Sequence, residues 1–235
     1  LVLGPQSMLQ PQFDRRLFFV RTVPVITVAV SLVAGLFALY VWSRRRDEPL
    51  YGLAGLIGIV WALRTTTFVF DMLPSDAWPL WRLVYHVSNG GFIVLLAWFA
   101  LALAHLQRRW LVALLLLWWA WGPLAFVLGG AGQAAELWLW RWWVPGLIPI
   151  GVMATVVALL AAWQRPSLAR VMVAGVFVLT FLCGVHDYLV AGRSPWLSAW
   201  LPRWSGHRFF LLHYGANLLL LTLGAVATLR YVRSL

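Results

Sequence analysis

Seven apolar stretches, each about as long as a helix needs to cross a bilayer, occupy nearly all of this 235-residue chain. A hydrocarbon core about 30 Å thick is spanned by about 20 helical residues. The apolar runs are continuous, whereas the strands of a membrane barrel alternate. Hydrophobic residues make up 63% of the chain and charged residues 11%. The sequence therefore predicts an all-α membrane protein, a seven-transmembrane helix bundle with spans at 20–42, 51–70, 79–106, 111–129, 139–163, 171–191 and 209–231.

The arginines predict which ends of the spans face the cytoplasm. An odd number of spans places the two ends of the chain on opposite sides of the membrane. With the N-terminus outside, seven arginines fall on the inner connections and four on the outer ones, a bias that agrees with the positive-inside rule. We therefore expect the N-terminus outside and the C-terminus in the cytoplasm. The inner set is Arg44, Arg45, Arg46, Arg108, Arg109, Arg165 and Arg170, and the outer set is Arg141, Arg193, Arg203 and Arg208.

The net charge of +11 belongs to this topology. Because the charges are interleaved with spans, they indicate orientation and contact with lipid headgroups rather than binding to nucleic acid. Many of the 17 tryptophans lie near predicted span ends, as in 138–143. This placement favours interfacial anchoring, and the alternative is an aromatic wall that contacts a ligand or an extracytoplasmic domain.

Composition also excludes one class of seven-helix protein. All 18 basic residues are arginine, and a retinal protein needs a lysine amine for its Schiff base. The absence of lysine indicates a GC-rich, hence bacterial, genome. The single cysteine, Cys183, cannot form an intrachain disulfide.

Polar residues inside the spans are the candidate site, because ionisable groups are costly in a bilayer. Three predicted spans carry histidine or aspartate at about the same depth, roughly 6 to 12 Å from the outer edge. On the third span, polar side chains follow one another at steps of four and three and so share a helix face. The adjacent His186 and Asp187 project about 100° apart and are not expected to point into one site. The candidates are Arg64, Asp71, Arg82, His86, Asn89, His186, Asp187, His213 and Asn217.

Three interpretations of this cluster remain open. It can be an interhelical network that fixes packing. It can be the floor of an outward-facing pocket for an unknown small ligand, in which the arginines favour an anionic group. It can also bind zinc through His86, His213 and either Asp187 or His186, with Cys183 as a further ligand; of these, His86, Asp187 and His213 are the candidates retained. Zinc is the weakest of the three, and the prediction is that the chain needs no cofactor.

Two further functions are alternatives. A small-solute transporter or channel would continue its polar groups to the inner face, whereas the span at 111–129 is almost wholly apolar. A zinc-dependent seven-helix membrane hydrolase carries paired histidines four residues apart, and the five histidines of this chain contain no such pair. It is the more distant alternative.

Four local sequences resemble those of bacterial seven-transmembrane receptors with diverse intracellular signalling modules. They are RRLFF at 15–19, the loop SRRRDEPLY at 43–51, GVHDYL at 184–189 and RFFLLHYG at 208–215. The resemblance implies that an extracytoplasmic β-sandwich sensor domain precedes the seven helices and that a histidine kinase or diguanylate cyclase follows them.

The resemblance then implies the organisation of the whole receptor. Residues 1–19 would be the tail of a missing extracytoplasmic sensor domain, and residues 20–235 would be the transmembrane domain. The expected function is to relay an extracytoplasmic signal to a cytoplasmic effector, in a homodimer in the bacterial inner membrane. The expected partners are the lipid bilayer, the sensor domain and the effector, and the segment itself is not expected to be catalytic.

Overall fold

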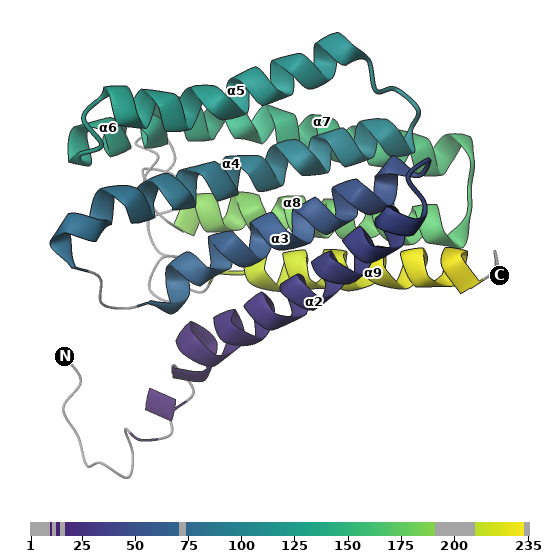
Figure 1. Ribbon diagram of the computed structural model, residues 1–235, viewed down its shortest axis with the longest axis horizontal. Coiled ribbons are helices and arrows are strands. Elements are labelled where there is room, and N and C mark those ends of the chain that lie inside the picture. The colour runs from purple at the N-terminus through teal and green to yellow at the C-terminus, as the bar shows by residue number, and fades with distance from the viewer. Residues whose placement is uncertain (1–9, 11–12, 15–16, 71–73, 191–209, 233–235) are drawn as a thin grey trace.

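The computed structural model describes residues 10, 13–14, 17–70, 74–190 and 210–232, and in these ranges the chain forms helices and short turns without a β-strand (Figure 1). Two π-helical turns and one 3₁₀ turn adjoin the α-helices. In chain order the elements are η1 Phe18–Thr22, α2 Val23–Arg44, α3 Pro49–Val69, η2 Ser75–Ala77, α4 Trp78–Leu103, α5 Arg109–Leu128, α6 Gln133–Trp138, η3 Leu139–Trp143, α7 Val144–Gln164, α8 Leu168–Val190 and α9 Leu212–Val232.

Proline lies near the start of several α-helices. Pro24, Pro49, Pro79 and Pro145 occupy one of the first two positions of α2, α3, α4 and α7. At the true start of a helix, as in α3, a proline loses no helical hydrogen bond, because the first amides have no partner within the helix. The other three α-helices continue directly from η1, η2 and η3, so their prolines do not mark where the helical segment begins.

Six helices pack into a closed ring. The ring runs from α2 through α3, α4, α7 and α8 to α9, which returns to α2, while α5 packs outside the ring against α4 and η3. Burial agrees with this order, since 72% of the apolar stretch of α4 is buried and only 17% of that of α5. The helix that carries Arg82 and His86 is therefore central, and α5 is at the edge.

The helices α2 and α3 approach each other closely at glycines. A Cβ added to Gly58 would lie 2.8 Å from the Cα of Gly35, so the two backbones meet where both residues lack side chains. Such small-residue crossings are typical of helix pairs in membranes, where packing rather than water exclusion holds helices together.

The helical prediction is confirmed in its coarser form. Six helical segments are long and apolar enough to cross a bilayer, which is the architecture of a multi-pass membrane protein. They are α2, α3, α4 with η2, α5, the run Gln133–Gln164 and α8. The remaining helix, α9, lies in the ring, and its described apolar stretch, Leu212–Val226, is shorter.

One predicted boundary is wrong. The fifth span was expected to begin at residue 139, with 130–138 as a connection, but helix begins at Gln133 and continues through α6 and η3 into α7. The helix includes the charged residue Glu136. Within the helix its charge is paired with Arg82, so the helix need not end before it.

The turns fall at two ends of the bundle. The turns at 45–48, 104–108 and 165–167 lie at the same end as the last turn of α9, on the right in Figure 1. The opposite end holds α6, the end of α3 and the start of α9. We name it the α6 end.

Candidate functional site

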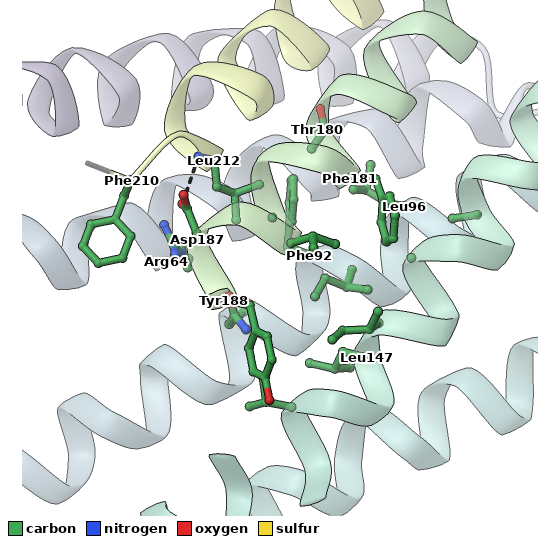
Figure 2. Close-up of a pocket in the computed structure, with 18 of the residues that line it drawn as sticks. Arg64, Phe92, Leu96, Leu147, Thr180, Phe181, Asp187, Tyr188, Phe210 and Leu212 are labelled. Atoms are coloured by element: carbon green, nitrogen blue, oxygen red, sulfur yellow. Dashed lines mark hydrogen bonds between the residues drawn. The ribbon is translucent and has the colours of Figure 1, made fainter. Parts of the chain in front are cut away.

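A cavity of about 240 Å³ lies in the half of the ring nearer the α6 end, between α3, α4, α7, α8 and the start of α9 (Figure 2). Polar side chains gather at one part of its wall and apolar ones at the rest. The polar lining includes Arg64, Arg82, Tyr85, Asn89, Asp187 and Tyr188, and the apolar lining includes Phe92, Leu96, Leu147, Phe177 and Phe181. The cavity therefore has a polar and an apolar part.

Asp187 joins the cavity wall to α9. Its Oδ1 accepts a hydrogen bond from the backbone N–H of Leu211 at 2.6 Å, and its Oδ2 accepts one from the N–H of Leu212 at 2.9 Å. The carboxylate, 7% exposed, thus caps the N-terminus of α9 from the neighbouring helix α8, as Figure 2 shows. A negative charge there satisfies amides without a helical partner and interacts favourably with the helix dipole.

His186 lies beside this carboxylate. Its Nδ1 is 3.1 Å from Oδ1 of Asp187. Of the two residues, Asp187 lines the cavity and His186 does not. His186 therefore reaches the cavity only through Asp187.

Arg64 is the buried cation of the site. It is 5% exposed, and its guanidinium lies 4.6 Å from the ring centroids of both Trp61 and Phe68. Its Nε and Nη1 have no hydrogen-bond partner among the residues that the structure describes. Tyr85 and Asp187 are near enough to interact with it electrostatically. Cation–π contacts stabilise the charge in part, and two donors remain available.

Arg82, by contrast, is already paired. Its Nε donates to Oε2 of Glu136 at 2.9 Å, and its Nη2 donates to Oε1, so the pair is bidentate. Trp140 Nε1 donates to the same Oε1 at 3.3 Å. This network ties α4 to the helix that starts at Gln133 and closes the cavity wall towards the α6 end.

Glu136 is the functional candidate that sequence reasoning missed. It is one of seven acidic residues in the chain and is 8% exposed. A signal was available, because a lone carboxylate inside a tryptophan-rich stretch of a membrane chain requires a cationic partner. Because 130–138 was expected to be a connection between spans, Glu136 was not treated as a charge inside the membrane.

His86 lies outside the cavity wall. It is fully buried, and its ring is 5.5 Å from that of Phe126 and 6.1 Å from that of Trp143. The predicted face of α4 is therefore divided, since Arg82 and Asn89 line the cavity and His86 packs towards α5 and η3. A step of four residues advances the side chain by about 40° around the helix, which is enough to change its neighbours.

His213 and Asn217 stabilise the packing of α9. The His213 ring lies 5.8 Å from that of Trp61 and 5.6 Å from that of Phe68. Asn217 Nδ2 donates to Thr27 Oγ1 at 2.8 Å and so links α9 to α2. These two predicted candidates belong to the helix interface. Asp71 lies outside the described residues.

The zinc alternative has no geometry to support it. Within the described ranges there is no group of three or more histidine, cysteine, aspartate or glutamate side chains that could hold a metal ion. The proposed ligands lie in different surroundings: His86 near Phe126, His213 near Trp61, and Asp187 at the start of α9.

Comparisons of the chain with protein families, with curated proteins and with solved structures find no match. The helices and the cavity alone define the class, a helical protein with the architecture of a multi-pass membrane protein and a cavity between its helices.

Proposed function

We propose that this chain is the signal-transducing membrane domain of a bacterial receptor. It crosses the cytoplasmic membrane seven times, with its N-terminus outside, and passes an extracytoplasmic signal to a cytoplasmic histidine kinase or diguanylate cyclase. The resemblance at 43–51 and 184–215 supports this class. Because both effector types work in pairs, we expect a homodimer.

The observation that carries the proposal is the Asp187 cap. The carboxylate stands in the cavity wall and holds the first amides of α9, and α9 runs from there to the other end of the bundle (Figure 1). A ligand or an adjoining domain that alters Asp187 therefore acts directly on the helix that leads to the effector. Helix displacements of about 1–2 Å at such interfaces are a common form of signalling.

The two hydrogen bonds to Asp187 are strong enough to shift α9 between two signalling states. A hydrogen bond to a charged group contributes about 1.5–3 kcal/mol, so the two amide bonds to Asp187 can bias α9 by several kcal/mol. A shift from 1:99 to 99:1 needs about 5.5 kcal/mol. Partial loss of the cap is enough to change the population of a signalling state by tenfold or more.

The arrangement of the arginines supports the orientation. The described turns at the end opposite α6 carry or adjoin seven of them, and under the positive-inside rule that end is cytoplasmic. The polar part of the cavity then lies nearer the outside, behind the network of Arg82 and Glu136. Alkaline phosphatase fused after residue 131 should be active and a fusion after residue 107 inactive. The reverse pattern would refute the orientation.

The decisive test measures effector output in the parent protein. We expect Asp187→Asn to change basal kinase or cyclase activity several-fold, because it removes the charge that caps α9. Asp76→Asn is the matched control, since Asp76 is an exposed carboxylate at the α6 end. The proposal is wrong if output is the same in both variants, or if the reading frame encodes no effector after residue 235.

A transporter is less well supported. Beyond the cavity the ring is filled by apolar side chains such as Phe99 and Leu219, and the ring of Phe99 stacks at 6.1 Å on that of Phe177, which lines the cavity. A solute path through the described bundle would have to displace this core. Phe177→Ala should therefore leave solute flux at background in proteoliposomes.

A further inference from the structure

The apolar part of the cavity offers few hydrogen-bonding groups to a ligand. Two threonines line it, but each hydroxyl is turned to a backbone carbonyl: Thr155 Oγ1 donates to Gly151 O at 2.9 Å, and Thr180 Oγ1 donates to Gly215 O at 3.0 Å. The remaining wall is aromatic and aliphatic. A ligand that enters this part must present hydrocarbon, because it would find few polar partners there.

The polar part has one cation with free donors. Arg82 is neutralised by its bidentate bond to Glu136. The carboxylate of Asp187 is directed to the amides of Leu211 and Leu212. Arg64 lines the cavity, and its Nε and Nη1 are buried without a hydrogen-bond partner in the described structure. A buried guanidinium with free N–H groups is a strong site for a carboxylate.

The size of the cavity limits the ligand further. Small-molecule sites in proteins generally measure about 300–1,000 Å³, and this cavity measures about 240 Å³. The cavity suits a ligand with one short hydrocarbon chain better than a lipid with two hydrocarbon chains. In Figure 2 Arg64 and Asp187 lie at one side, and Phe92, Leu96 and Phe181 lie away from them.

We propose that this cavity binds a single-chain amphiphile, a fatty-acid-like anion whose headgroup pairs with Arg64 and whose hydrocarbon tail fills the space lined by Phe92, Leu147 and Phe181. The inference deepens the proposed function, on which it rests for its biological meaning, by naming the class of ligand. The headgroup lies next to Asp187, so binding acts where the cavity meets α9.

Binding can be measured directly with radiolabelled decanoate. The whole chain is placed in nanodiscs of zwitterionic phosphatidylcholine, which offers no competing anionic lipid, and the signal from empty nanodiscs is subtracted. We expect saturable binding that unlabelled decanoate displaces. Decanol, which lacks the charge, and acetate, which lacks the tail, should each compete at least tenfold less well. Equal competition by decanol would show that Arg64 takes no part, and equal competition by acetate would show that the apolar part takes none.

Two pairs of variants locate the headgroup and the tail. Arg64→Gln should weaken decanoate binding at least tenfold, whereas Arg64→Lys, which keeps a cation, should retain most of it. For the tail, Gly184→Leu is the probe, since an added Cβ there would meet only Leu212 Cδ1, at 3.7 Å, and the longer side chain would occupy the cavity. Gly175→Leu is its matched control on the same helix, because Gly175 is exposed and its Cβ would meet nothing within 4 Å.

The outcomes separate the ligand class from the proposed function. Loss of binding in Gly184→Leu but not in Gly175→Leu, together with the preference for decanoate, supports the inference. Unchanged affinity in folded Arg64→Gln or in Gly184→Leu overturns it. If Arg64→Gln does not fold, the inference is tested by whether Arg64→Lys retains most decanoate binding and whether decanol competes at least tenfold less well than decanoate. Because no effector is needed, binding without regulated output counts against the proposed function alone, and regulated output without binding counts against the ligand class alone.

Discussion

The bidentate pair between Arg82 and Glu136 gives the sharpest prediction about stability. Glu136→Gln keeps the size of the side chain but removes its charge and one of the oxygens that accept from the guanidinium. Removing one partner of a buried ion pair costs about 3–5 kcal/mol. The two side chains are 20% and 10% exposed, so solvent screens the pair in part. A glutamine also keeps one acceptor. We therefore expect a loss of about 2 kcal/mol in the free energy of unfolding.

The assay is unfolding by SDS titration in mixed micelles, followed by far-ultraviolet circular dichroism. A double-mutant cycle that combines Glu136→Gln with Arg82→Met isolates the interaction energy between the two residues, because the double variant leaves no unpaired charge. We expect the double variant to be more stable than the sum of the single losses predicts, by about 2 kcal/mol. Asp76→Asn is the control for loss of an exposed carboxylate and should change stability by less than about 0.5 kcal/mol. Additive single losses would refute the account, since independent sites add within about 0.3–0.5 kcal/mol.

Two other predictions concern local packing. Asp187→Asn should speed hydrogen exchange of the Leu212 amide about tenfold or more, because a neutral acceptor holds the start of α9 less firmly; unchanged exchange in mass spectrometry would show that the carboxylate is not the cap. Gly122→Ala should lower the free energy of unfolding by about 1–3 kcal/mol, since its Cβ would collide with the Trp143 ring. Gly175→Ala, whose Cβ meets nothing within 4 Å, should cost less than about 0.5 kcal/mol in the same SDS titration. Equal losses in the two glycine variants would contradict the observed packing of Trp143.

Much of the secondary structure could be read from the chain. Apart from the fifth, the predicted spans agree with α-helices to within about three residues, because continuous apolar runs and prolines at helix starts are local signals. The start of the fifth predicted span is wrong, because the helix also includes Glu136. Whether a carboxylate ends a helix or lies buried within it depends on a partner that is 54 positions away in the sequence.

The candidate site was predictable as a set of residues and not as a geometry. Position along a helix can be estimated from the sequence, and Arg64 and Asp187, which were expected near one level, both line the cavity. Which of them share a cavity depends on rotation about the helix axis and on the neighbours that packing supplies. That is why His86 faces Phe126 rather than the cavity.

The sequence by itself determined that this chain forms apolar helices, because a bilayer leaves a long lipid-exposed segment no other way to satisfy its backbone. Only the tertiary structure decided how the charges are divided among them. Arg82 is paired with Glu136 and Asp187 with the amides at the start of α9, while Arg64 lines the cavity and has two buried nitrogens without a hydrogen-bond partner in the described structure. The physical reason is that the pairing of buried charges depends on contacts between distant segments, which form only when the helices pack.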